Sequence, residues 1–102
     1  MIVWTSNVYV GKKMRNKKTN AVASINGSEV TFGVYCIAFA SNPDNLFDII
    51  NANELLFPYY RNKETRIVGL AKGKEEAMKL VQTMLMEVYN RTGNFDVRSY
   101  FI

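Results

Sequence analysis

Three regions in the first half of the chain have the composition of β-strands. Residues 2–10 are rich in valine and aromatic side chains and end at a glycine, which predicts a first strand. Residues 20–26 and 28–40 follow, separated by Asn26-Gly27, a dipeptide that supplies the two positive φ angles of a type I′ turn. The pattern therefore predicts a β-hairpin at Asn26-Gly27.

The chain then changes to a helical spacing. Asn42, Pro43 and Asp44 are residue types found at a helix start: a capping side chain, a proline in the first turn and an acid near the positive end of the helix dipole. Apolar residues follow one helical face as far as Pro58, with Asn53 as a candidate break. We predict a first helical segment here.

The stretch from Lys72 to Gly93 has the clearest helical pattern, with one apolar stripe formed by Ala77, Val81, Met84, Leu85 and Val88. A strand over 65–71 precedes it, and weak alternation over 95–102 predicts a final strand. The order β-β-β-α-β-α-β predicts a single α+β domain over residues 1–102. Its mixed or antiparallel sheet would have about four or five strands, with two helical segments packed on it.

Residue types that carry common chemistry are scarce. Histidine is absent and cysteine occurs once, so the chain lacks the commonest general base and the ligands that zinc needs. Cys36 lies between Phe32 and Ala40, a segment that is apolar on both alternating faces and is expected inside the sheet, with an unreactive thiol. We expect a protein without catalytic activity, cofactor or bound metal. A carboxylate-dependent enzyme is the less favoured alternative.

The amino-terminal residues do not have the pattern of a signal peptide, which would place a basic region before an apolar run. No apolar stretch approaches the roughly 20 residues that a membrane span needs. We therefore expect a cytoplasmic protein.

Positive charge is concentrated in one segment. The formal net charge is +4, and residues 11–20 hold five of the thirteen Lys and Arg residues and no Asp or Glu. A projecting loop of this kind suits contact with the phosphates of nucleic acid or with another polyanion. The candidate residues are Lys12, Lys13, Arg15, Lys17 and Lys18. The alternative is a solvated connection between two strands, whose lysines discourage edge-to-edge pairing.

A second candidate group combines aromatic and basic side chains. Tyr59 and Tyr60 are candidates for base stacking, and Arg61, Lys63 and Arg66 for phosphate contact, provided that the fold brings them to the face of the basic segment. The alternative is that the tyrosines pack against the core while the charges keep the loop in water.

Two weaker patterns involve glycines and acids. Gly69 and Gly73, with Lys72 and Lys74, lie between a predicted strand and a predicted helix, where backbone amides can hold a phosphate, although no known phosphate-binding motif is present. Asp44 and Asp48 would share a helical face and could contact Mg²⁺, but a pair of carboxylates without further ligands more often forms a solvated first turn.

The C-terminal helix has more apolar surface than one stripe consumes. Met78 and Met86 lie off the stripe and are candidates for an interface with a second copy or with a protein partner. The sequence thus predicts a small cytosolic binding protein that contacts nucleic acid or another polyanion through residues 11–20. The alternative is a homo-oligomeric or partner-binding accessory protein that uses this helix.

Overall fold

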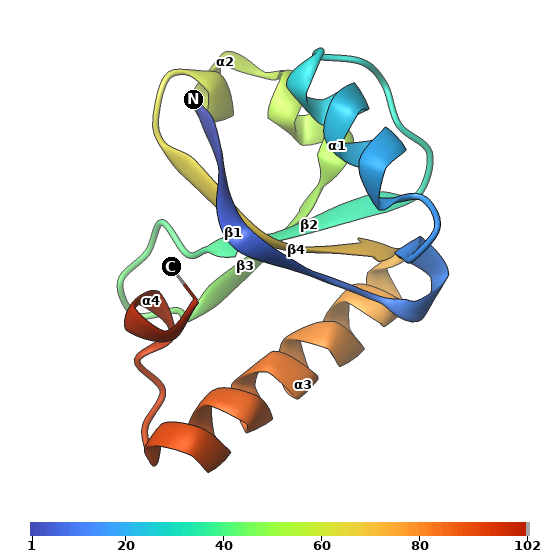
Figure 1. Cartoon of the computed structure of the whole chain (residues 1–102). Helices are drawn as coiled ribbons and strands as arrows, with labels where there is room; N and C mark the ends of the chain where they lie inside the picture. The colour runs from blue at the N-terminus through green and yellow to red at the C-terminus, as the bar shows by residue number, and fades with distance from the viewer. Residues whose placement is uncertain (102) are drawn as a thin grey trace.

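Four strands and several helices make up the protein, whose computed structural model describes residues 1–101 (Figure 1). The strands are β1 (Ile2–Val10), β2 (Val34–Phe39), β3 (Phe47–Asn51) and β4 (Thr65–Lys72). The helices are α1 (Lys18–Asn26), α2 (Pro58–Arg61), α3 (Lys74–Thr92) and α4 (Val97–Tyr100), with 3₁₀ turns η1 (Lys12–Met14) and η2 (Ala52–Leu56). The predicted α+β class is confirmed.

The strands form one mixed sheet in the order β1-β4-β2-β3. β1 runs parallel to β4, while β2 is antiparallel to both β4 and β3. The predicted interior position of the strand that holds Cys36 is confirmed, since β2 lies between two other strands. The thiol of Cys36 is fully buried.

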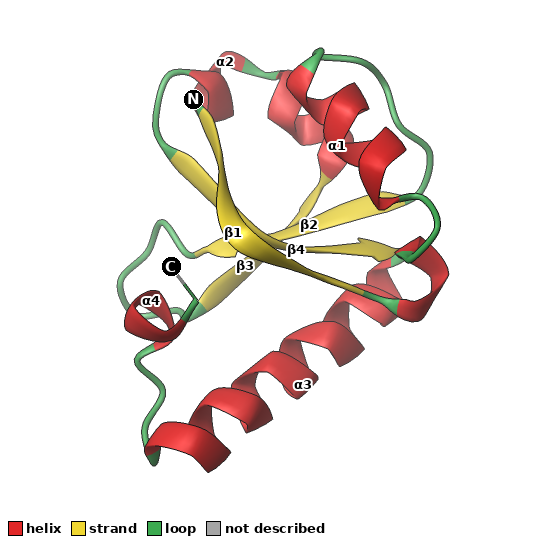
Figure 2. Ribbon diagram, viewed as in Figure 1, coloured by secondary structure: helices red, strands yellow, loops and turns green. Residues whose placement is uncertain are grey.

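Helices cover both faces of the sheet, which Figure 2 shows as a yellow layer between α1 and α3. One core cluster packs η1, α1 and η2 on the first face, and a second packs α3 and α4 on the other. Consecutive residues of a strand point to opposite faces, so Ile67 of β4 belongs to the first cluster and Val68 to the second. The sheet is therefore buried on both sides, which explains its apolar strands.

The strong patterns near the ends of the chain were predicted correctly. β1, β4 and α3 occupy the expected residues, and Met84 and Val88 of the predicted stripe are fully buried. Gly93 ends α3 with a φ of 76° and donates its N–H to the carbonyl of Tyr89 at 2.8 Å. This left-handed conformation favours glycine because a Cβ would be strained there.

The predicted β-hairpin at Asn26-Gly27 is wrong. Residues 18–26 form α1, and Gly27 has a φ of −84°, so the positive φ falls on Ser28 (56°) instead. Ala21 and Ile25, four residues apart, are buried in the first cluster, and this tertiary contact outweighs the local turn preference of Asn-Gly. The side chain of Asn26 accepts a hydrogen bond from the indole of Trp4 at 2.8 Å.

The predicted helical segment before Pro58 is also wrong. The side chain of Asn42 accepts the N–H of Asp44 at 2.9 Å in a local turn, and residues 47–51 then pair with β2 as β3. Only η2 is helical in the predicted range, and Pro58 begins α2 rather than ending a helix. Pairing with β2 supplies backbone partners that the local capping pattern does not reveal.

The end of the chain turns into a helix instead of the predicted strand over 95–102. α4 begins after Asp96, whose side chain accepts hydrogen bonds from the N–H and hydroxyl of Ser99 at 3.4 and 2.8 Å. Ile102, the last residue of the predicted strand, lies outside the described residues. Among residues 1–101, none of the helices is both long and apolar enough to cross a membrane.

Candidate anion-binding site

The parallel strands β1 and β4 end at the same edge of the sheet (Figure 1). Beyond this edge β1 continues through Gly11 into η1, and β4 continues through Gly73 into α3. The N–H of Gly11 donates to the carbonyl of Leu70 at 2.9 Å, and the N–H of Gly73 donates to the carbonyl of Gly33 at 2.7 Å. These bonds bring the segments after β1 and β4, and the segment before β2, to one corner.

The side chain of Glu76 joins the parts of this corner. One carboxylate oxygen accepts the backbone N–H of Lys13 at 2.7 Å, and the other accepts the N–H of Lys72 at 2.6 Å. Glu76 therefore connects η1, β4 and α3. It lies so close to Gly11 that a Cβ on that residue would be 2.4 Å from the Glu76 Cδ. Glycine at position 11 thus leaves the space that the carboxylate occupies.

A hollow of about 680 Å³ lies at this corner. Among its lining residues are two glutamates and five lysines, so the lining carries a net charge of +3: Lys12, Lys13, Lys72, Lys74, Lys79, Glu75 and Glu76. The negative charge of Glu76 is matched by the two backbone N–H groups that it accepts. The lysine ammonium groups are thus the main charges that the hollow presents to a ligand.

Most of these lysines have no acidic partner. Within residues 1–101 the ion pairs are Arg66–Glu64 and Lys79–Glu75, each at 3.6 Å. Both side chains of the Lys79–Glu75 pair are strongly exposed, so the attraction between their charges is weak. The ammonium of Lys72 donates to the carbonyl of Phe32, which leaves its positive charge uncompensated.

The rest of the basic segment continues from this corner along η1 and the start of α1. Met14 is fully buried and anchors η1 in the first core cluster. Arg15 and Lys17 are exposed, and Lys18 is half-buried at the first position of α1. The segment is therefore an anchored helical turn, where the sequence predicted a loop between two strands.

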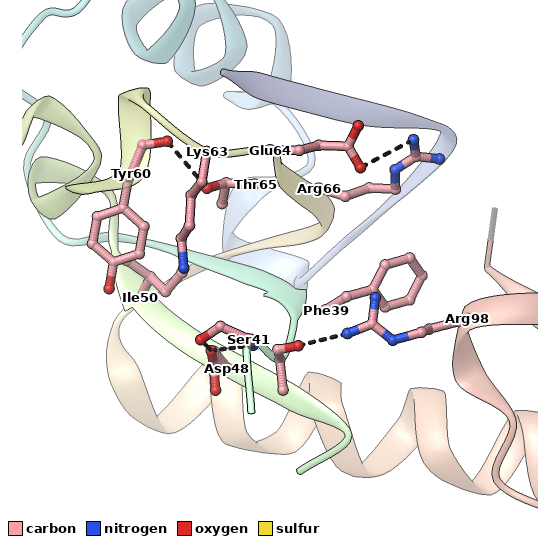
Figure 3. A pocket seen from close by; sticks show the side chains of 11 residues that line it. Phe39, Ser41, Asp48, Ile50, Tyr60, Lys63, Glu64, Thr65, Arg66 and Arg98 are labelled. Atoms are coloured by element: carbon pink, nitrogen blue, oxygen red, sulfur yellow. Dashed lines mark hydrogen bonds and ion pairs between the residues drawn. The ribbon is translucent and has the colours of Figure 1, made fainter. Parts of the chain in front are cut away.

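The second candidate group lies elsewhere, around a hollow of about 310 Å³ beside the start of β4 (Figure 3). Lys63 and Arg66 line it, together with Arg98 of α4, which the sequence analysis did not single out. The two arginines that line this hollow already have partners within the protein. Arg66 pairs with Glu64, and Arg98 donates to the carbonyl of Ala40 at 2.6 Å while its guanidinium lies 5.1 Å from the ring centre of Phe39.

Arg61 has a structural role. Its guanidinium donates to the carbonyl of Leu55 at 2.6 Å and to the carbonyl of Ile25 at 2.9 Å, so it connects η2 with the end of α1. Positive charge at a helix end also matches the helix dipole. These bonds hold Arg61 against backbone carbonyls, and Arg61 lines neither hollow.

The two tyrosines of this group differ in exposure. Tyr59 is exposed, with the ammonium of Lys63 4.2 Å from its ring centre, while Tyr60 packs against the first core cluster. The rings meet edge to face with centres 4.9 Å apart. A hydrogen bond from Lys63, followed by one from Ser41, lowers the pKa of Tyr59. Of the two stacking candidates, Tyr59 has the more accessible ring.

The two basic groups lie near opposite ends of β1. Val3 pairs with Arg66 near the start of β1, whereas Lys12 and Lys13 follow its last residue, Val10. At about 3.3 Å per residue, the strand separates the groups by roughly 25 Å. The structure thus does not bring Lys63 and Arg66 to the basic segment. The basic segment instead has Lys72 and Lys74 as neighbours, on either side of Gly73 before α3.

The remaining residues singled out in the sequence are Asp44, Asp48 and Cys36. Asp48 belongs to β3 and accepts the N–H of Ser41 at 3.2 Å, so the predicted helical pairing with Asp44 is wrong. Burial raises the pKa of the Cys36 thiol to about 12. Burial, then a hydrogen bond to Glu87, raises the pKa of Tyr9 to about 12 as well. In the part of the chain that the structure describes, no group of three His, Cys, Asp or Glu residues could hold a metal ion.

The two methionines proposed for an interface lie on the outer side of α3. Met78 is 51% exposed and Met86 57% exposed, eight residues apart and thus on one helical face. Tyr89 follows on this face and stacks on Phe95 with ring centres 5.1 Å apart. This face is the second notable surface of the molecule.

No family model, curated protein or solved structure matches this chain. The geometry and charge of these surfaces are therefore the guide to function.

We predict that Gly11 and Glu76 are energetically coupled. Gly11→Ala should lower the free energy of unfolding by about 1–3 kcal/mol, because its Cβ meets the Glu76 side chain. Glu76→Ala should cost about 1–3 kcal/mol through the loss of two charged hydrogen bonds. In the double variant the alanine at position 11 meets no carboxylate. The double variant should therefore be destabilised by less than the sum of the two single-variant costs. Urea unfolding of the four proteins measures this coupling.

Gly93→Ala at the far end of α3 is the control, since its positive φ is strained by a Cβ but open space surrounds it. It should cost about 1 kcal/mol in the wild type and in the Glu76→Ala background alike. Costs of Gly11→Ala and Glu76→Ala that add within about 0.5 kcal/mol would contradict the coupling.

Proposed function

We propose that this chain is a small, non-catalytic binding protein that holds nucleic acid at the lysine-lined hollow, where β1 and β4 end. The observation that carries the proposal is the convergence of two basic segments, far apart in sequence, on one corner with a net charge of +3. Phosphate groups are the natural ligands of clustered lysines. A cytoplasmic location, where nucleic acids are accessible, is part of this proposal.

Exposed cations that follow Lys12 and Lys13 along the chain support binding to the nucleic-acid backbone. Arg15 and Lys17 are exposed and lie between η1 and α1. They can contact further phosphates of the same strand. Lysine ammonium groups act as point charges on phosphate, so they supply affinity with little dependence on base sequence.

We predict that binding weakens steeply with salt and depends on these lysines. The logarithm of the association constant should fall with the logarithm of salt concentration, by about 0.7 to 0.9 for each phosphate neutralised. The triple variant Lys12→Ala, Lys13→Ala, Lys74→Ala should bind more weakly to all sequences and reduce this slope by about two to three units. Fluorescence anisotropy with labelled oligonucleotides measures both quantities.

Arg91→Ala is the control for loss of a positive charge elsewhere on the molecule, because Arg91 is exposed and lies about 25 Å along α3 from Lys74. It should leave the affinity and the slope nearly unchanged. A triple variant that binds as tightly as the wild type would show that the lysines only solvate the corner. Absence of wild-type binding at about 50 mM salt, where electrostatic association is strong, would end the nucleic-acid proposal.

A second candidate function is self-association through the outer face of α3. The exposed side chains of Met78, Met86 and Tyr89 support it. An antiparallel pair of α3 helices would bring these exposed apolar side chains together at its centre.

For this candidate we predict a dimer at micromolar concentration. Met86→Lys should convert it to a monomer without unfolding it, because a charge would be buried at the centre of the interface. Val30→Lys is the matched control, since Val30 is 62% exposed and lies outside α3. Sedimentation equilibrium gives the mass. A wild-type protein that stays monomeric at high concentration would remove this candidate.

A further inference from the structure

Phe32 is the most exposed large apolar side chain among residues 1–101, with 82% of its surface accessible. It precedes β2, where the sequence predicted an interior strand, but β2 begins only at Val34. The ring therefore adds nothing to the core. A single exposed apolar side chain is common on a protein surface, so the meaning of this one depends on what lies beside it.

The backbone on both sides of Phe32 is held firmly. Thr31 is buried, and its N–H and hydroxyl both donate to the side-chain oxygen of Asn53, at 2.7 and 3.1 Å. The amide of Asn53 donates back to the carbonyl of Thr31 at 2.9 Å. On the other side, Gly33 has a φ of 68° and its carbonyl accepts the N–H of Gly73. Phe32 is thus displayed from an anchored turn.

This turn borders the lysine-lined hollow. The carbonyl of Phe32 accepts the ammonium of Lys72, which lines the hollow. In the sheet, β4 lies between β1 and β2, so Phe32 and the pair Lys12 and Lys13 flank the end of β4 from opposite sides. Adjacent strands lie about 4.8 Å apart, so β1 and β2, with β4 between them, are separated by on the order of 10 Å. A short segment of extended nucleic acid can span this distance.

We propose that Phe32 is a stacking residue for a base, and hence that the hollow takes single-stranded nucleic acid in preference to duplex. The inference rests on the proposed function and names the form of the ligand. Lysines alone do not distinguish single strands from duplexes, since both present phosphates. A free base can stack on an exposed ring, whereas the bases of a duplex are already stacked on one another.

The test compares a short labelled single strand with the matching duplex by fluorescence anisotropy. Phe32→Ala should lower the single-strand affinity by about 5- to 150-fold, the usual effect of losing one stacked base. Affinity for the duplex should stay within about twofold, and the salt slope should be unchanged because no charge is removed. Phe32→Tyr, which keeps the ring, should bind like the wild type.

Phe57→Ala is the matched control, because Phe57 is also exposed (61%) but directly precedes α2, whose Tyr60 and Arg61 carbonyls accept the amino group of Met1 at the other end of β1. It should leave binding to both forms unchanged. Phe32→Trp gives a second measurement, independent of affinity. Its emission should be quenched on addition of the single strand, beyond any change in the wild-type protein, whose one tryptophan is Trp4.

Several outcomes would overturn this inference. Single-strand affinity of Phe32→Ala within twofold of the wild type, or an equal loss for single strand and duplex, would show that the ring does not stack on a base. A changed sedimentation mass of Phe32→Ala would show that it contacts protein. If the lysine variants lower the salt slope while Phe32→Ala has no effect, only the stacking role fails. If the wild type binds neither form, the proposed function fails with it.

Discussion

The corner at the ends of β1 and β4 depends on the carboxylate of Glu76. It accepts one backbone N–H from η1 and one from β4, and so connects two segments about sixty residues apart to the first turn of α3. The arrangement works only because Gly11 has no side chain. The carboxylate of Glu76 is a negative group among the lysines of the hollow. Two backbone N–H groups stabilise its charge, and through them it holds the backbone of Lys13 and of Lys72 in place.

The sheet topology determines which charges meet. Because β1 and β4 are parallel neighbours, the residues that follow them leave the sheet at the same edge, and ligands of open α/β sheets commonly bind beyond the carboxyl ends of the strands. β2 is antiparallel to β4, so its amino end, with Phe32, reaches that edge too. The opposite edge gathers Lys63 and Arg66, but there the basic groups are paired with carboxylates, carbonyls or rings.

The local sequence pattern was sufficient to predict the fold class and the elements β1, β4 and α3. In these elements the hydrophobic periodicity and the residues at the element ends agree with the tertiary structure. The local pattern failed at Asn26-Gly27, because burial of Ala21 and Ile25 under the sheet outweighs the turn preference. The basic residues were found one by one, but the convergence of Lys12 with Lys74 follows from parallel pairing that no local signal encodes. Phe32 was taken for a strand residue, since exposure cannot be read from residue type.

The claim that nucleic acid binds at the corner of β1, β4 and α3 is tested most directly by an NMR titration of the labelled protein with a short single-stranded oligonucleotide. Amide signals should shift at residues 11–13, 32–33 and 72–76, which surround the hollow. Signals of residues 63–66, at the other end of β1, should stay in place. Shifts confined to residues 63–66, or no shifts at low salt, would contradict the account.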